Sequence, residues 1–315
     1  MLNTTQSKIS LLIDEMEKVI LGKREVLQLT VAAFLAGGHV LFEDIPGVGK
    51  TMLVKTLAKA IHGKFSRIQF TPDLLPSDIL GITVYNTASQ AFEFHPGPIF
   101  TTVLLADEIN RTTPRTQAAL LEAMSERHVT IDNHTYTLDE HFFVLATQNP
   151  VDYEGTYPLP EAQLDRFLFR LHIGYPEFAD ELELLLNRQS DQLVSIRQVL
   201  NAAEVTQLKA LVDEVYVDPQ IARYALQLVQ ATREHDSIAL GISPRGSLAF
   251  IKAARAFALT EGRTFVTPDD LQRILPAVFG HRLLLKNNHT ANEAQIQEIM
   301  EQILRRVPVP IRKQL

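Results

Sequence analysis

One short segment constrains this chain more than any other. Residues 44–51 (DIPGVGKT) lie between an apolar run at His39–Glu43 and a helical pattern over Lys50–Ile61. Glycines in such a loop let backbone N–H groups approach an anion without a Cβ in the way. The N-terminus of the following helix adds partial positive charge at the same point. A strand, this loop and a helix in succession predict a phosphate-binding loop in a parallel α/β fold.

Two side chains of the loop have predicted roles. Lys50 is expected to reach the β- and γ-phosphates of a nucleotide, and the Thr51 hydroxyl is expected to ligate Mg²⁺. The chain departs from the usual GxxxxGK[ST] pattern because Asp44 stands at the first glycine position. We expect Pro46 and Gly47 to help make the first turn instead. The competing interpretation is a surface turn that merely ends a strand.

The rest of the chain divides into an α/β part and a helical part. Five short runs, rich in β-branched or aromatic residues and apolar on both faces, are expected to form buried parallel strands. They are His39–Glu43, Phe65–Phe70, Val103–Ala106, Phe142–Thr147 and Phe167–Ile173. Only helical patterns follow after about Tyr175. We therefore predict an αβα parallel-sheet domain over residues 1–190, with hairpins inserted at about 71–101 and 128–140, and a smaller all-α domain over 191–315.

Composition narrows the possible functions. The 315 residues are 46% hydrophobic and 21% charged, which is typical of a globular protein of about two domains. The absence of cysteine excludes disulfides, thiolate metal sites and a cysteine nucleophile. A net charge of −7 counts against general nucleic-acid binding. No apolar stretch is long enough to span a membrane and no secretory signal is visible, so a cytoplasmic location is expected.

Asp107 and Glu108 follow the apolar run at Val103–Ala106. In a nucleotide site the first acid holds Mg²⁺ through its water shell, and the second orients and deprotonates the attacking water. Acids are also common at helix N-termini, so the pair alone is a weak signal. Its place downstream of the phosphate-binding loop favours the functional interpretation.

Asn149 ends the run that begins at Phe142. Ligands of open α/β folds bind at the carboxyl edge of the sheet. There Asn149 could hydrogen-bond the attacking water or the γ-phosphate. The alternative is an asparagine that starts a turn before Pro150.

Two arginines complete the candidate set. Arg166 stands just before the last predicted strand, where it could neutralise charge on a neighbouring subunit's γ-phosphate; the alternative is an ion pair with Asp165. Arg245 follows Ser243 and Pro244 in a helix-start pattern. A cation in the first turn opposes the helix dipole, so an anion is expected opposite it, and a phosphate would serve.

Taken together, these segments resemble the AAA+ ATPases, and among them the MoxR family. The matching segments are EDIPGVGKT, LLADEINR, TQNP, LPEAQLDRF and SPRG, which cover most of the chain. The resemblance implies an αβα domain with a helical lid, bound ATP and Mg²⁺, and a family role for each candidate. These are Walker A (Gly47, Val48, Gly49, Lys50, Thr51, Met52), Walker B (Asp107, Glu108), sensor 1 (Asn149), the arginine finger (Arg166), sensor 2 (Arg245) and the adenine-wrapping segment (Val19, Ile20).

The resemblance also implies a setting for the activity. Relatives are ring-forming, usually hexameric ATPases that remodel or mature protein complexes, commonly with a separate von Willebrand factor A domain protein. The two predicted insertions match segments that face the pore in relatives. Residues 71–101 contain no lysine or arginine, which favours a protein client over DNA. The aromatic side chains there could contact it or pack within the insertion: Tyr85, Phe92, Phe94 and Phe100.

Three other functions stay open at this level. One is the motor subunit of a metal chelatase, and another is a scaffold that binds ATP but hardly hydrolyses it. The third is a nucleic-acid remodeller, supported only by the basic tail at Arg305, Arg306, Arg312 and Lys313. Such a tail is more often a solvated helix end.

Overall fold

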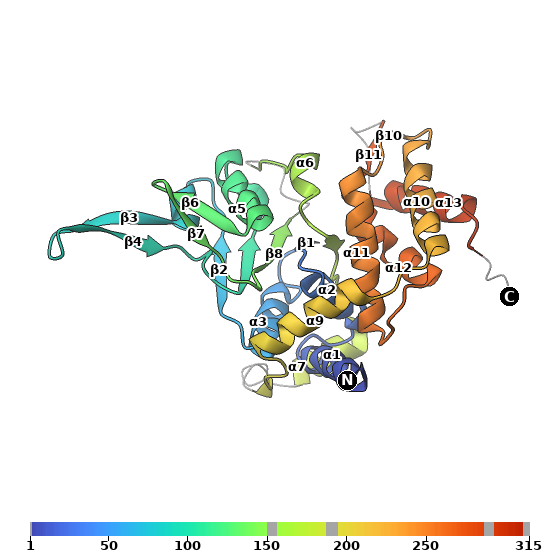
Figure 1. The fold of residues 1–315 in the computed structure, drawn as a ribbon, viewed down its shortest axis with the longest axis horizontal. Coiled ribbons are helices and arrows are strands. Elements are labelled where there is room, and N and C mark those ends of the chain that lie inside the picture. The colour runs from blue at the N-terminus through green and yellow to red at the C-terminus, as the bar shows by residue number, and fades with distance from the viewer. Residues whose placement is uncertain (1, 150–155, 187–194, 287–292, 311–315) are drawn as a thin grey trace.

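A computed structural model describes residues 2–149, 156–186, 195–286 and 293–310, and the statements below concern these residues. The chain forms a sheet-centred body on one side and a group of helices on the other (Figure 1). A two-stranded ribbon projects from the sheet side, away from the helices (Figure 1). No described helix combines the length and apolar character that a membrane crossing requires.

The central sheet has five strands in the order β2-β5-β8-β1-β9, and all its pairings are parallel. The strands are β1 (Val40–Glu43), β2 (Phe65–Gln69), β5 (Val103–Asp107), β8 (Phe143–Gln148) and β9 (Phe169–Leu171). The sheet confirms the predicted α/β class. Strands β5, β8 and β1 are almost wholly buried because helices cover both faces, which explains their continuous apolar sequences.

Helices lie on both faces of this sheet. Alternate residues of each strand point to opposite faces, so Phe42 and Leu105 pack in one hydrophobic cluster while Leu41 and Leu104 pack in another. The first cluster includes side chains of α1 (Leu2–Glu17), α2 (Arg24–Leu35) and α3 (Lys50–Ala60), and the second includes side chains of α5 (Pro114–Glu126). The result is three layers with the sheet in the middle.

Two hairpins interrupt the α/β pattern. The longer one, β3 (Gly81–Asn86) with β4 (Ala91–Pro96), follows the short helix α4 (Pro76–Leu80) and forms the projecting ribbon (Figure 1). The second pairs β6 (His128–Ile131) with β7 (His134–Thr137). The two residues between β6 and β7, an Asp-Asn pair, both have positive φ angles, as the tightest hairpin turns require.

The aromatic side chains of residues 71–101, which include the longer hairpin, divide into two groups. Phe94 stacks on Tyr136 of the second hairpin with ring centroids 4.1 Å apart, and Phe100 lies 5.6 Å from Phe94. Tyr85 and Phe92 contact each other near the outer end and are 50% and 74% exposed. The rings of Phe94 and Phe100 pack against Tyr136 and so join the second hairpin to this inserted segment. Contact with a client stays a prediction for all four side chains.

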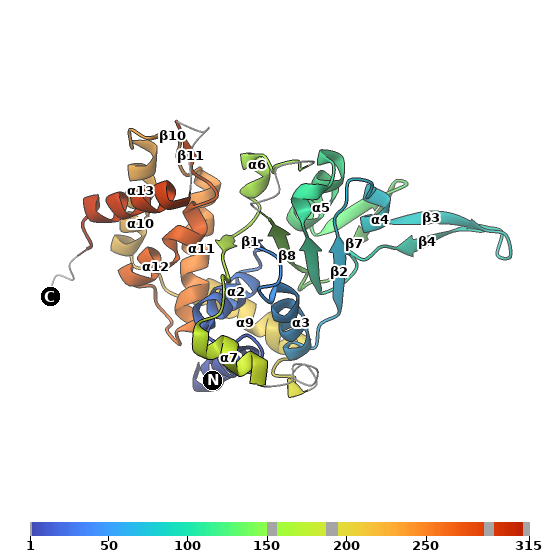
Figure 2. The same cartoon turned by 180° about the vertical axis from the view of Figure 1, so that it is seen from behind.

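The second half of the chain is mainly helical. Its described helices are α7 (Phe178–Leu186), α9 (Ala202–Glu214), α10 (Pro219–Arg233), α11 (Pro244–Thr260), α12 (Pro268–Phe279) and α13 (Glu293–Arg306). Four of these helices begin with an N-cap side chain that accepts a hydrogen bond from a backbone N–H of the first turn. The N-cap residues are Asn201, Asp218, Ser243 and Thr267. Helix α7 lies beside α1 in both views (Figures 1 and 2).

The expectation of an all-α second domain needs one correction. A small antiparallel sheet joins β10 (Ile238–Leu240) to β11 (Leu284–Leu285) within it. Strands of two and three residues are too short to show the alternating pattern from which strands are predicted. The domain boundary proposed at residue 190 lies outside the described residues. One hydrophobic cluster contains buried side chains of α2 and of α10, α11 and α12, so the helical part packs directly on the α/β part.

Candidate functional site

The loop between β1 and α3 has the backbone that its glycines predict. Gly47 and Gly49 have φ angles of +91° and +97°, a left-handed conformation that glycine adopts without strain. Gly49 is the N-cap of α3, so the free N–H groups of that helix begin at the loop. Pro46 and Gly47 lie in the first turn of the loop, as expected for a loop with aspartate at position 44.

A cavity of about 360 Å³ opens beside this loop. It brings together predicted residues from three segments: Gly47, Gly49, Lys50, Thr51 and Met52 from the loop and α3, Asp107 and Glu108 from the end of β5, and Asn149 just after β8. The carboxyl ends of parallel strands meet at one edge of a sheet, which is why residues about 40 to 100 positions apart converge here.

Lys50 occupies a charged environment. Its ammonium donates a hydrogen bond to the main-chain carbonyl of Asp44 at 2.8 Å. Burial lowers the pKa of Lys50, while the nearby charges of Asp44, Asp107 and Glu108 oppose that shift. A bound phosphate would add negative charge and favour the ammonium form.

The two acids are held by hydrogen bonds from neighbouring strands. The Thr147 hydroxyl donates to Asp107 Oδ1 at 2.6 Å and accepts from the backbone N–H of Glu108 at 2.8 Å. Glu108 itself has a φ angle of +59°, which turns the chain sharply after β5. The carboxylate of Glu108 accepts from Gln69 Nε2 at 2.7 Å and lies 3.3 Å from Arg111 of the short helix η1 (Ile109–Arg111).

Three cavity residues were not identified from the sequence: Arg67, Gln69 and Thr147. Arg67 donates to Asp107 Oδ2 at 2.7 Å, so a cationic side chain already faces this carboxylate. The pairing of Gln69 with Asp107 in the β2–β5 register brings these side chains together. For Arg67 and Gln69 the available signal was their polarity at alternate positions of the run Phe65–Phe70, which was expected to be apolar on both faces.

The predicted adenine-wrapping residues lie behind the loop. Val19 and Ile20 are buried, at 5% and 6% exposure, and belong to the same hydrophobic cluster against which Val48 and Met52 pack. The Ile20 side chain comes within 3.8 Å of the position that a Cβ on Gly49 would take. These contacts place the segment next to the loop, although neither residue lines the cavity.

The two arginines are outside the set of cavity-lining residues. Arg166 follows the short helix α6 (Glu161–Leu164) and donates to the carbonyl of Leu121 at 2.8 Å and to the Ser125 hydroxyl, while its buried Nε has no partner. An anion does face Arg245, but it is Asp165, at 4.0 Å. Asp165 also pairs with Arg282 at 2.7 Å, and it makes no ion pair with Arg166 among the described contacts.

Thr51 and Asp107 were predicted to hold Mg²⁺, and their chemistry fits that ion. Hydroxyl and carboxylate oxygens are the ligands that Mg²⁺ prefers, and it usually keeps several waters and substrate phosphates as its other ligands. The Asp107 carboxylate already pairs with the Arg67 guanidinium, which also lines the cavity, so it is placed where it can bind a cation there.

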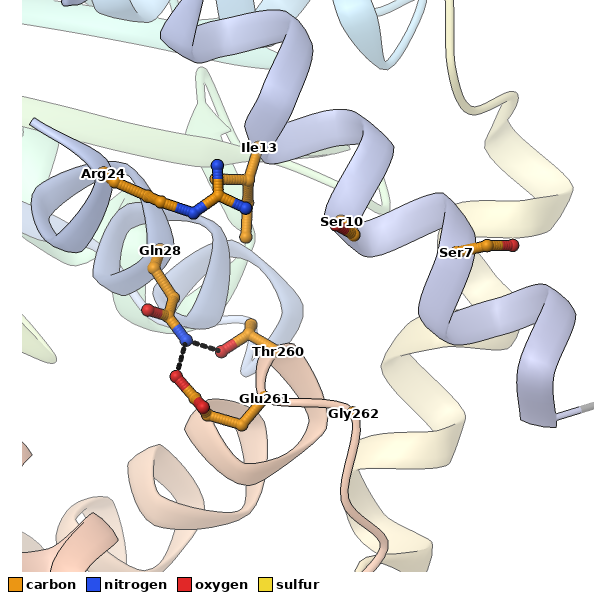
Figure 3. A pocket seen from close by; sticks show the side chains of 8 residues that line it. All are labelled: Ser7, Ser10, Ile13, Arg24, Gln28, Thr260, Glu261 and Gly262. Carbon is orange, nitrogen blue, oxygen red and sulfur yellow. Dashed lines mark hydrogen bonds between the residues drawn. The ribbon is translucent and has the colours of Figure 1, made fainter. Parts of the chain in front are cut away.

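A larger cavity, about 540 Å³, lies between α1, α2 and the end of α11 (Figure 3). Gln28 bridges across it to the Thr260 hydroxyl at 3.1 Å and to Glu261 at 2.5 Å. Arg24 is paired with Asp14 and Glu17. Gln28 and Arg24 thus bond to other residues of the chain, and none of the predicted site residues lines this larger cavity.

Comparison with known proteins gives consistent matches. Residues 39–169 match the model of the "ATPase family associated with various cellular activities (AAA)", and residues 230–303 match that of the AAA lid domain. An uncharacterized protein of Bacillus subtilis, YeaC, is 50% identical over 96% of this chain and 94% of its own length. Chaperone MoxR1 of Mycobacterium tuberculosis is 40% identical over 94% of this chain and 81% of its own.

A solved structure and a more distant relative complete the comparison. The crystal structure of a protein from Cytophaga hutchinsonii, provisionally described as an ATPase, superimposes with a TM-score of 0.89 at 37% identity and covers 98% of this chain and 97% of its own. Magnesium-chelatase subunit ChlI of Chlorella vulgaris is 24% identical over 58% of this chain and 51% of its own.

Proposed function

Because this chain belongs to the MoxR family of AAA+ ATPases, we propose that it hydrolyses Mg²⁺-bound ATP to remodel or mature protein complexes. The observation that carries the proposal is the convergence of Lys50, Thr51, Asp107, Glu108 and Asn149 around one cavity. The chelatase alternative has weaker support, since the chelatase relative is distant and the chaperone-named relative is similar along nearly the whole chain.

In this proposal each cavity residue acts on a defined part of the substrate. Lys50 exchanges its carbonyl partner for the β- and γ-phosphates. Glu108, oriented by Gln69, accepts a proton from the attacking water as the water oxygen bonds to the γ-phosphorus. The bond to the bridging oxygen breaks, and the products are ADP and inorganic phosphate. Bound at Thr51 and Asp107, Mg²⁺ would neutralise charge on the phosphate oxygens.

Asn149 completes the cavity on the side of β8. Its place in the same cavity lining as Glu108 suits a hydrogen bond to the attacking water or to a γ-phosphate oxygen. Arg166 and Arg245 lie outside the lining. We propose that Arg166 contacts the nucleotide of an adjoining copy at a subunit seam, and that Arg245, as sensor 2, contacts a nucleotide phosphate. We therefore propose a homo-oligomeric ring, hexameric as is usual for relatives.

The projecting hairpin supports a protein client. Tyr85 and Phe92 form an exposed aromatic pair on it, and residues 71–101 carry no cation that could neutralise a phosphodiester backbone. Of the basic tail, Arg305 pairs with Glu301, whereas residues 312 and 313 lie outside the described residues. A separate von Willebrand factor A domain partner and a cytoplasmic location remain part of the proposal.

Substitution of the proposed base tests the activity directly. Glu108→Gln should bind ATP like the wild type but hydrolyse it about 10²–10⁴ times more slowly, because the amide cannot accept the proton. Glu122→Gln, at an exposed position on α5, is the matched control and should hydrolyse ATP normally. Phosphate release and binding of a labelled ATP analogue are the measurements.

The same variant can identify the client. Glu108→Gln held in its ATP-loaded state should retain interacting proteins in affinity capture, whereas the same variant with ADP should not. Undiminished hydrolysis by Glu108→Gln would refute the role of Glu108. A wild-type protein that binds ATP but releases no phosphate would support the scaffold alternative instead.

A further inference from the structure

Asp44 stands where phosphate-binding loops usually have glycine, and its side chain is fully engaged. The residue is only 7% exposed. Its two carboxylate oxygens accept hydrogen bonds from consecutive backbone N–H groups, Ile173 at 2.7 Å and Gly174 at 3.0 Å. Gly174 has a φ angle of +65°, so the chain turns there, just beyond β9. A glycine at position 44 would leave both donors without this acceptor.

The backbone of Asp44 makes two further contacts. Its N–H donates to the carbonyl of Gln148 at 3.3 Å, which continues the β1–β8 pairing. Its carbonyl accepts the hydrogen bond from the Lys50 ammonium at 2.8 Å. Because β1 lies between β8 and β9, this one residue connects the start of the loop to both neighbouring strands and to Lys50.

The turn that Asp44 holds is fixed from a second side. Lys23 donates to the carbonyl of Tyr175 at 2.7 Å, directly after Gly174. Lys23 follows the Val19–Gly22 segment, and Ile20 of that segment lies against Gly49 of the loop. The turn at 173–175 thus contacts both the start of the loop and the residue that follows the Val19–Gly22 segment.

We propose that Asp44 is a positioning residue for nucleotide binding. Its carboxylate holds the start of the loop against the turn at Ile173 and Gly174, so that its carbonyl keeps Lys50 in place before ATP arrives. This rests on the proposed function of the cavity. The two N–H donors share the negative charge of Asp44, which permits a carboxylate beside a phosphate site. A pre-ordered loop loses less conformational entropy when it binds its ligand.

A purely structural role predicts a different outcome. If Asp44 only stabilised the fold, its loss would lower the melting temperature and leave the KM for ATP unchanged. If it positions the loop, KM rises while kcat changes little, because the contacts of Lys50 are made in both the ground state and the transition state. The ratio of these two effects separates the two roles.

Asp44→Gly is the sharpest variant, since it restores the usual glycine of the motif. We expect KM for ATP to rise about tenfold with kcat within about twofold. Asp44→Asn should have a smaller effect because its amide oxygen still accepts one N–H. Asp270→Asn is the matched control: Asp270 is 2% exposed, accepts from the backbone N–H of Thr267 at 2.8 Å, and lies on α12.

Hydrogen exchange reports on the contact itself. The amides of Ile173 and Gly174 should be protected in the wild type and exchange faster in Asp44→Gly, while Asp270→Asn leaves them unchanged. If Asp44→Gly does not fold, Asp44→Asn carries the same test. Wild-type KM in a folded Asp44 variant, or an equal rise in Asp270→Asn, would overturn the inference. If wild-type protein binds no ATP at all, the proposed function fails and not this inference alone.

Discussion

The candidate nucleotide cavity and the buried contact around Arg282 both contain arginine and acidic side chains, but these side chains have different roles in the two regions. In the cavity, the side chains of Arg67, Asp107 and Glu108 are 47%, 16% and 21% exposed. At the contact between β9 and α12, the Arg282 side chain is only 4% exposed and donates to the Asp165 carboxylate at 2.7 Å and to the carbonyls of Phe167 and Leu168 at 2.6 and 3.2 Å. Acceptors of the chain itself bind the Arg282 guanidinium, whereas open space remains in the cavity beside Arg67, Asp107 and Glu108.

The difference shows where charge supports structure and where it is available for a ligand. A buried guanidinium with all acceptors from its own chain fixes the position of the helical part. Burial of this kind costs desolvation, so removal of one partner is expensive. The side chains of Arg67, Asp107 and Glu108 keep solvent access, so their loss should change activity more than stability.

The largest effect on stability is expected at Arg282. Arg282→Met should lower the free energy of unfolding by about 3–5 kcal/mol, because it removes the buried cationic partner of the Asp165 carboxylate together with hydrogen bonds to main-chain carbonyls. Urea unfolding measures this. The control is Arg305→Met, where an 80% exposed side chain pairs with Glu301, and it should change stability by less than about 0.5 kcal/mol. Equal effects of the two substitutions would contradict the comparison.

A smaller effect depends on pH and concerns His39 in the sheet. Burial lowers the pKa of His39 to about 4, from an ordinary value of 6.5. Its Nδ1 accepts from the backbone N–H of Val144 at 3.0 Å, and its Nε2 faces the carbonyl of Met124 at 3.2 Å. Between pH 6.5 and 4 the unfolded chain binds a proton that the native chain does not. Stability should therefore fall by up to about 3 kcal/mol as the pH drops through this window.

Replacement of His39 separates its contribution to the loss of stability at low pH from the contributions of other buried groups. Burial also lowers the pKa of His281, so part of the acid sensitivity belongs to that residue. His39→Asn keeps an acceptor for the Val144 N–H but does not titrate. Urea unfolding at a series of pH values should show a shallower decline for this variant. A decline as steep as that of the wild type would mean that His39 contributes nothing to it.

The smallest effect on stability is expected at Arg245. Its side chain is 61% exposed and lies 4.0 Å from Asp165, so Arg245→Ala should change the free energy of unfolding by no more than about 0.5 kcal/mol. Because we propose that Arg245 contacts a nucleotide phosphate as sensor 2, the same variant should hydrolyse ATP more slowly. A stability loss close to that of Arg282→Met, with normal hydrolysis, would instead assign Arg245 to the structure.

Local patterns were sufficient for much of the fold. The predicted strands at Phe65–Phe70 and Val103–Ala106 differ by one residue from β2 and β5, because short buried strands have a strong apolar signature. The short pair β10–β11 was missed because it has too few residues to show a pattern. For Phe94 and Phe100, packing and client contact had equal support in the sequence. Their packing on Tyr136 of the other hairpin appears only in the tertiary structure.

The sequence by itself determined the loop, because glycines at positions 47 and 49 and the lysine and threonine after them act through their own backbone and near neighbours. Tertiary structure alone decided the partners of side chains that act at long range. Asp44 finds its donors 129 and 130 residues away, and Arg67 finds Asp107 through the pairing of β2 with β5. Such partners follow from the order of strands in the sheet, which many separate segments set together and no local pattern encodes.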